Sequence, residues 1–331
     1  HSDNTSVGYN SLKAITTGGN NVAIGSGAGD AITTASFNVA IGANALSAED
    51  TGGASVAIGA YALTAQNGNG KNVAIGHQAA VRNTTGEKNV IIGYEAGLGA
   101  VSANWTKNVA VGHQALYSLQ TDADNNVGIG DSAGFNITTG DNNIFIGGES
   151  GDATTSGSNN VAVGKGALTT NTTTAGNTAI GYRALYTLDY TNTNSPRNVA
   201  VGYDAGYYLD AGYDLTAVGY EAGYKSDDNY GNTFVGVISG KYIDDGNYNT
   251  AIGGYSMFGT DENGNDASYN TALGYGSLQA ITDADYNTAI GMNSGNDITT
   301  GGQNTLVGYD SGSKLTTGFG NVSMGVNSLL T

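Results

Sequence analysis

The sequence predicts an all-β fold, a parallel β-solenoid in which about 19 coils of about 17 residues stack on one another. Two observations predict it. A five-residue motif returns at an almost constant interval along all 331 residues, and the motif alternates with the period of two that is typical of a β-strand. The composition adds a third observation, because 54 glycines suit a chain of regularly repeated turns.

The repeated motif reads Asn, Val or Thr, Ala, an aliphatic residue and Gly. Its glycine occurs 19 times, at steps of 17 residues except for four longer steps of 18, 19, 21 and 21 residues. A disordered chain does not keep such a register, so the high glycine content does not indicate disorder. The motif glycines are Gly8, Gly25, Gly42, Gly59, Gly76, Gly93, Gly112, Gly130, Gly147, Gly164, Gly181, Gly202, Gly219, Gly236, Gly253, Gly274, Gly291, Gly308 and Gly325.

Each coil is expected to hold two short strands joined by turns. In the first strand, residues 21–25, the side chains of Val22 and Ile24 are expected to point into the core and that of Ala23 away from it. A second strand is expected in the looser half of the coil, as at residues 31–34. Stacked coils would then form two parallel sheets.

An asparagine opens nearly every copy of the motif, and only Ser55 and Leu215 interrupt the column. Stacked amides hydrogen-bond from one coil to the next, so the column is expected to form an asparagine ladder. If this first position of the motif were merely exposed, its residue would be expected to vary among Asp, Ser and Lys from one copy to another. The ladder residues include Asn21, Asn72, Asn108, Asn160, Asn198, Asn249 and Asn287.

The central residue of the motif strand is expected to face another chain. If Val22 and Ile24 fill the core, the central side chain points outward, yet this position holds no charged residue in any copy. Such a row on an acidic protein is expected to be covered, and another copy of the chain is the natural cover. The predicted interface includes Ala23, Ala57, Phe145, Ala162, Ala179, Ala200, Phe234, Ala251 and Leu306.

Charge and composition disfavour several classes of function. The net charge of −17 argues against nucleic acid as a partner, because phosphate binding requires clustered Lys and Arg. No apolar run approaches the roughly 20 residues that span a bilayer, so no membrane insertion by this segment is expected. The absence of cysteine excludes disulfides and thiol nucleophiles and suits an extracellular location. Because the motif is in phase at both ends, we expect residues 1–331 to be one solenoid segment of a longer fibre protein.

No arrangement of residues suggests catalysis or a bound cofactor, so the chain is expected not to be an enzyme. His77 and His113 occupy equivalent positions two coils apart, roughly 10 Å at ordinary strand spacing, which is too far for both to bind one metal ion. Oxygen-rich turns are weak candidates for binding Ca²⁺. The carboxylates concerned are Asp122, Asp124, Asp283 and Asp285.

Long insertions and aromatic residues are the candidates for receptor binding. The insertions span residues 98–107, 186–197 and 257–269, and loops carry binding function more often than scaffolds do. Tyrosine is concentrated after residue 180, where 17 of the 21 tyrosines lie. Exposed aromatic rings suit contacts with sugars or proteins, but tyrosine also covers a pleated surface well without any such role. The candidate receptor contacts are Trp105, Tyr190 and Tyr269.

The motif resembles the head repeats of trimeric autotransporter adhesins and related segments of phage tail fibres. Residues 55–59 read Ser-Val-Ala-Ile-Gly, the motif of that family, and residues 177–181 and 287–291 read Asn-Thr-Ala-Ile-Gly, its common variant. The resemblance covers nearly the whole chain. It implies a left-handed parallel β-roll, a homotrimeric rod of three chains side by side, and attachment to a surface. The coil is longer here than in those heads, which leaves room for a different cross-section.

The expected function is that of a trimeric extracellular fibre or adhesin segment, on a virion tail fibre or a cell surface. It would form a rigid shaft and attach to a host surface glycan or a protein receptor. Two other classes remain open. A purely structural, self-assembling filament or spacer would lack receptor binding, and an ice-binding solenoid would need flat threonine arrays. Threonine pairs such as Thr33 and Thr34 recur too irregularly to favour the latter.

Overall fold

The chain forms two compact units, unit 1 (His1–Asn160) and unit 2 (Val161–Thr331), in a computed structural model that describes residues 3–68, 70–101, 103–188, 196–260 and 265–330. Both units are all-β parallel solenoids, and these residues form 19 strands, one for each copy of the motif. The predicted all-β parallel solenoid and its repeat of about 17 residues are therefore confirmed.

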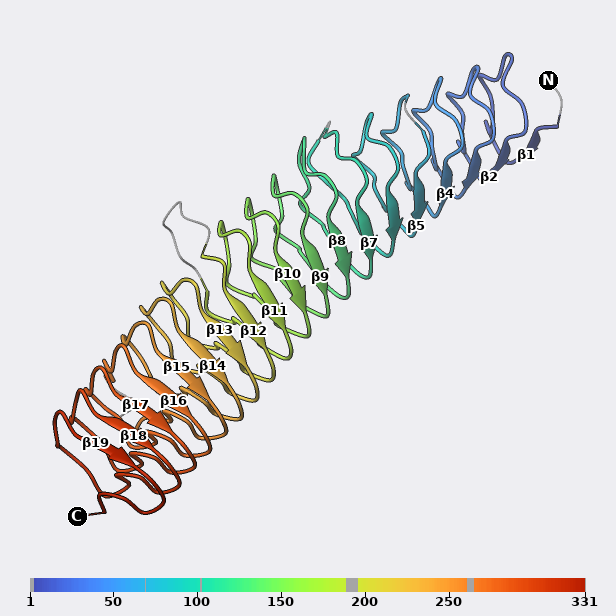
Figure 1. Cartoon of the computed structure of the whole chain (residues 1–331). Coiled ribbons are helices and arrows are strands. Elements are labelled where there is room, and N and C mark those ends of the chain that lie inside the picture. The colour runs from blue at the N-terminus through green and yellow to red at the C-terminus, as the bar shows by residue number, and fades with distance from the viewer. Residues whose placement is uncertain (1–2, 69, 102, 189–195, 261–264, 331) are drawn as a thin grey trace. The chain divides into compact units, whose positions relative to one another are not determined.

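Unit 1 contains nine strands of three residues each, which pair in parallel with their neighbours one coil away. Figure 1 shows successive strands side by side. The strands are β1 (Thr5–Val7), β2 (Val22–Ile24), β3 (Val39–Ile41), β4 (Val56–Ile58), β5 (Val73–Ile75), β6 (Val90–Ile92), β7 (Val109–Val111), β8 (Val127–Ile129) and β9 (Ile144–Ile146).

Unit 2 contains ten strands with the same parallel pairing. The register holds across the longest insertions, because Thr250 still pairs with Thr271 and Thr178 with Val199. The strands are β10 (Val161–Val163), β11 (Thr178–Ile180), β12 (Val199–Val201), β13 (Thr216–Val218), β14 (Thr233–Val235), β15 (Thr250–Ile252), β16 (Thr271–Leu273), β17 (Thr288–Ile290), β18 (Thr305–Val307) and β19 (Val322–Met324).

The second strand predicted in each coil is absent from the described part of the chain. Residues 31–34 form turns and bends, because the N–H of Ile32 donates to the carbonyl of Gly29 in its own coil while that of Thr33 donates to Asp50 in the next. A bond that returns to its own coil interrupts the ladder that a parallel strand requires. The remainder of each coil is thus a series of turns, and no described residue is helical.

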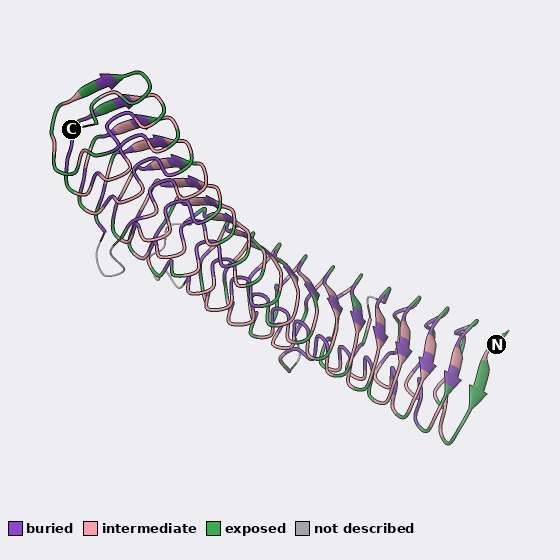
Figure 2. Ribbon diagram, turned by 90° about the horizontal axis from the view of Figure 1, so that it is seen from below, coloured by how far each residue is buried: buried purple, intermediate pink, exposed green. Residues whose placement is uncertain are grey.

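The side chains of the motif strands point in the opposite direction from the prediction. Ala23 is fully buried, whereas Val22 and Ile24 lie on the outer face and Ile24 is 39% exposed. This pattern recurs in β2–β19, and Figure 2 shows it as strands that are purple at the centre and pink or green at the ends. A coil of this length encloses little space, so the small central residue lies inside and the β-branched residues lie outside.

The core compensates for each large central residue with a nearby glycine. Most central residues are alanine, and the large ones are Ile91, Phe145, Phe234 and Leu306. In each of these four coils the residue four positions after the motif glycine is also glycine, at Gly97, Gly151, Gly240 and Gly312. In coils with a central alanine, a buried leucine such as Leu46 or Leu63 often takes that position. The core thus accepts one large side chain from either position.

The asparagine column forms a ladder within each unit, and its members are buried. The Oδ1 atom of Asn108 accepts from the backbone N–H of Asn126 at 2.8 Å, and its Nδ2 donates to the carbonyl of Ala123 at 2.8 Å. The backbone N–H of Asn108 in turn donates to Oδ1 of Asn89. Backbone and side chain are therefore tied from coil to coil. The predicted residues that lie buried in it are Asn21, Asn72, Asn108, Asn160, Asn198, Asn249 and Asn287.

Candidate functional site

The row of residues predicted to face another chain is instead the core of its own chain. Each member is fully buried, so none of them is available for contact with a partner, and this part of the prediction is wrong. The prediction exchanged the two faces of the strand. Because side chains alternate between faces, such an exchange misplaces every residue of the row. The residues are Ala23, Ala57, Phe145, Ala162, Ala179, Ala200, Phe234, Ala251 and Leu306.

The outer face of the unit 1 sheet is apolar. Strands β2–β9 each present two outward side chains, and all of these are Val or Ile that are partly or fully exposed. Soluble monomers rarely expose continuous apolar surfaces of this kind. We call this surface the outer face, and its residues are Val22, Ile24, Val39, Ile41, Val56, Ile58, Val73, Ile75, Val90, Ile92, Val109, Val111, Val127, Ile129, Ile144 and Ile146.

The corresponding face of unit 2 is more polar, because threonine replaces valine in its first outward row. Six consecutive strands, β13–β18, begin with threonine in register, while the second outward row remains Val, Ile or Leu. The two units therefore present chemically different sheet faces. The threonines are Thr216, Thr233, Thr250, Thr271, Thr288 and Thr305.

Of the three candidate receptor contacts, one lies in the core of the chain. Trp105 is fully buried, with its indole against Gly97 and Gly99, so it is a core residue and cannot contact a receptor. A Cβ atom at residue 99 would lie 2.8 Å from the indole Nε1, which explains glycine there. Tyr190 lies outside the described residues. Tyr269 is exposed, 48% of its surface being accessible.

Tyr269 belongs to a row of stacked tyrosines in the turns that precede the strands of unit 2. Its ring stacks on Tyr286 at a centroid distance of 4.9 Å and on Tyr248 at 5.3 Å. Tyr230 and Tyr213 extend the row in the other direction. Tyr230 meets Tyr248 edge to face, and the other neighbouring rings of the row are stacked. We call these five residues the tyrosine row.

Two further tyrosine stacks in unit 2 are joined by Arg183. Its guanidinium lies 4.8 Å from the ring centroids of both Tyr182 and Tyr207. It also forms a bidentate ion pair with Asp204, at 2.9 and 2.6 Å, and this pairing raises the pKa of the guanidinium. Burial raises the pKa of Tyr224, in the same stack as Tyr207, to about 12. The phenols of Tyr207 and Tyr224 are therefore neutral at physiological pH, and the cluster stabilises the stacking of coils.

The carboxylates proposed as calcium ligands include members of a second hydrogen-bonded ladder. Asp124 and Asp285 lie two residues before the motif asparagine, and the Oδ1 atom of each accepts a backbone N–H from the preceding coil, at 2.7 Å from Thr106 and 2.8 Å from Ser268. Asp141 accepts from Asp124 in the same way. Among the described residues no group of three or more acidic or histidine side chains forms a metal site. A structural role thus accounts for Asp124 and Asp285.

His77 and His113 are held apart by an aromatic ring. Tyr94 stacks between them, with centroid distances of 5.4 Å to His77 and 5.6 Å to His113. The Nδ1 atom of His113 lies 2.8 Å from a carboxylate oxygen of Asp131. The two imidazoles therefore belong to an exposed stack, as their spacing in the sequence indicates.

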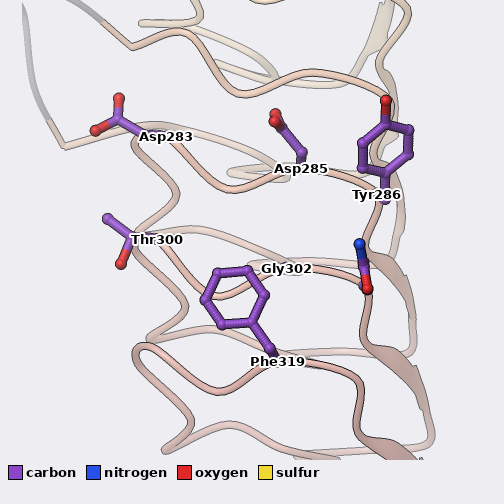
Figure 3. A pocket seen from close by; sticks show the side chains of 7 residues that line it. Asp283, Asp285, Tyr286, Thr300, Gly302 and Phe319 are labelled. Atoms are coloured by element: carbon purple, nitrogen blue, oxygen red, sulfur yellow. The ribbon is translucent and has the colours of Figure 1, made fainter.

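A pocket of about 240 Å³ lies beside the last ring of the tyrosine row, in the turns that precede β17–β19. Figure 3 shows its labelled side chains on three successive coils. Phe319 was not predicted as a site residue, although it occupies a repeat position where other coils of unit 2 carry Asp285 or Gly302. We call this the Phe319 pocket, and it is lined by Asp283, Asp285, Tyr286, Thr300, Gly302, Gln303 and Phe319.

Fold and surface together define a β-solenoid repeat protein with one apolar sheet face and stacked aromatic side chains. No protein-family model matches the chain, and no curated protein matches it in sequence. Within the described residues there is no helix with the length and apolar character needed to cross a bilayer.

Proposed function

We propose that this chain is a segment of a homotrimeric extracellular fibre, on a phage tail fibre or a cell-surface adhesin, with a structural and non-enzymatic role. The proposal includes the left-handed β-roll of the trimeric adhesin heads, which the motif resembles. In this role the solenoid serves as a shaft that carries attachment to a host surface glycan or protein receptor.

The outer face of unit 1 is the observation that carries the proposal. Its Val and Ile side chains cover one face of a parallel sheet. Contact of so many apolar groups with water is unfavourable, and association would remove that contact. Unit 1 has no helix or second sheet among its described residues that covers this face. A second and third copy of the same face, related by closed rotational symmetry, would bury it. The interface proposed now is the outer face and not the central row.

Charged substitutions on the outer face test the proposal. Ile41→Asp with Ile75→Asp adds two charges on β3 and β5, and we expect the trimer to dissociate into folded monomers in native mass spectrometry. Circular dichroism would show that the strands remain. Ala43→Asp is the matched control, because Ala43 is exposed and its repeat position carries Asp131 in another coil. A wild-type protein that is monomeric at micromolar concentration would contradict the proposal.

Ala179→Asp separates the two interface assignments. Ala179 is buried in the core of unit 2, so a carboxylate there should unfold the neighbouring coils and not release folded monomers. If Ala179→Asp gave folded monomers, the central row would be the interface after all.

The alternative is a structural spacer without receptor binding. The tyrosine stacks favour it, because rings that lie against one another stabilise coil stacking and leave few faces for a ligand. Binding of purified trimers to candidate host cells distinguishes the two functions. Attachment that is saturable supports the adhesive function, and its absence supports the spacer.

A further inference from the structure

The Phe319 pocket is lined by an exposed aromatic ring that belongs to none of the tyrosine stacks. Phe319 is 66% exposed, and Cε1 and Cδ1 of its ring lie beside Gly302. A Cβ atom at residue 302 would lie 2.9 Å from Cε1 of the phenylalanine ring, so glycine is what permits this position. Figure 3 shows the ring at the backbone of residue 302, with the carboxylate of Asp285 on the coil before it.

Tyr286 contributes the second aromatic group. It is the last ring of the tyrosine row: Tyr269 stacks on one of its faces, and the equivalent position of the next coil holds Gln303 in place of another ring. Among the described residues, no aromatic ring covers its other face. The pocket thus begins where the row of stacked rings ends.

The pocket is negatively charged. Asp283 and Asp285 line it, no Lys, Arg or His does, and neither aspartate forms an ion pair within the described chain. The nearest basic residue in the sequence, Lys314, pairs with Asp297 at 3.0 Å. Asp285 uses Oδ1 to accept from the N–H of Ser268, which fixes the carboxylate in place at the pocket.

We infer that the Phe319 pocket binds an organic ammonium group. The electron-rich faces of Phe319 and Tyr286 attract a cation, and the two carboxylates supply complementary charge and hydrogen-bond acceptors. The inference rests on the proposed function, because it identifies the chemistry through which a surface ligand would be recognised. Two surface sources carry this group: choline headgroups of lipids, and amino sugars of glycans.

Titration of the isolated protein with matched compounds tests the inference. Choline and glucosamine carry the ammonium group, while 3,3-dimethylbutan-1-ol and N-acetylglucosamine are their uncharged counterparts. We expect the ammonium compounds to shift the ring resonances of Phe319 and Tyr286 in NMR spectra at constant ionic strength. Saturation by choline alone indicates a headgroup ligand, and saturation by glucosamine alone indicates an amino sugar. Equal binding of charged and uncharged partners, or no binding at millimolar concentration, would overturn the inference.

Variants locate the binding site. Phe319→Ala should weaken ammonium binding by a factor of about two to five, the range expected for an exposed cation–π contact. Asp283→Asn should weaken it also, while leaving uncharged compounds unaffected. Phe37→Ala is the matched control, because Phe37 is an equally exposed phenylalanine in unit 1 and should not change binding. Because this assay needs neither a trimer nor a cell, loss of cell attachment with intact ammonium binding would count against the proposed function alone.

Discussion

The ring of Phe145 occupies the space that a side chain at Gly151 would need: a Cβ atom at residue 151 would lie 2.5 Å from the ring Cδ1. The pair shows how the solenoid keeps its core filled. In no coil do both the centre of the strand and the residue six positions later carry a large side chain.

This relationship predicts a compensating double mutant. Phe145→Ala leaves a cavity and should destabilise the protein by about 3–5 kcal/mol. Adding Gly151→Leu should recover much of that loss, because Ala40 and Leu46 form the same combination in another coil and Leu46 has a φ of 53°, close to the 58° of Gly151. Urea denaturation followed by circular dichroism measures both changes. Gly151→Leu alone should be destabilising, and a neutral result for it would refute the packing relationship.

The motif glycines should not tolerate a side chain. Gly42 has a φ of 128°, and a Cβ atom there would lie 2.6 Å from the carbonyl carbon of Gly59 in the next coil. Gly42→Ala should therefore cost at least about 2 kcal/mol through strain and collision. Gly325→Ala is the control, because its φ of 124° is close to that of Gly42 but no atom lies within 4 Å of the added Cβ. A smaller melting-temperature loss for Gly325→Ala separates the collision from the backbone strain.

The asparagine ladder predicts a graded response at Asn108. Asn108→Leu leaves the buried N–H of Asn126 and the carbonyl of Ala123 without their partners and should cost about 2–4 kcal/mol. Asn108→Ser retains an acceptor, as Ser55 does when its Oγ accepts from the N–H of Asn72 at 3.3 Å, and should cost less. Hydrogen exchange of the Asn126 amide would report the loss locally. Equal effects of the two substitutions would show that the amide contributes only through packing.

Glu49 predicts an unusual pH dependence. Its side chain is fully buried, Oε1 accepts from the N–H of Gly68 at 3.1 Å, and Oε2 has no hydrogen-bond partner among the described residues. Burial raises the pKa of this carboxyl above its usual value of 4.5. The folded state therefore binds the proton more tightly than the unfolded state, so this residue favours folding below pH 4.5 and loses that contribution as pH rises through its folded pKa.

Glu49→Gln should therefore raise the melting temperature at pH 7.5 and leave it almost unchanged at pH 4.5. Glu87→Gln serves as the control, because hydrogen bonding to Lys88 lowers the pKa of the partly exposed Glu87 carboxyl. That substitution should not stabilise the protein at pH 7.5. A lower melting temperature for Glu49→Gln at pH 7.5 would contradict the prediction.

The periodic sequence was sufficient to predict the solenoid, its strand positions and its coil length, because each follows from spacing alone. The asparagine column could also be predicted, since an amide repeated in phase has few roles other than a ladder. Side-chain direction could not: alternation separates Ala23 from Val22 and Ile24 but does not say which face is inside. The larger side chains of Val22 and Ile24 were expected to fill the core, but the narrow interior of the coil holds the smaller side chain of Ala23.

The candidate site was predicted less well, for two physical reasons. Trp105 was judged by its place in an insertion, but a large apolar ring lowers its free energy by entering the core when glycines such as Gly97 leave room for it. The Phe319 pocket combines residues from three coils, which come together only when the coils stack. The sequence alone indicates Asp283 and Asp285 as a pair, but it does not show that the ring of Phe319, two coils later, lines the same pocket.

Because each asparagine bonds only with the coils directly before and after it, the solenoid has no preferred number of coils. Removing residues 22–38, a stretch equal to one 17-residue repeat, would join Asn21 to Val39 and restore the motif with the ladder intact. In-frame duplication or loss of such a stretch would leave the motif in phase. The length of this protein can therefore change during evolution by one repeat at a time, while the interactions that hold each coil to its neighbours stay the same.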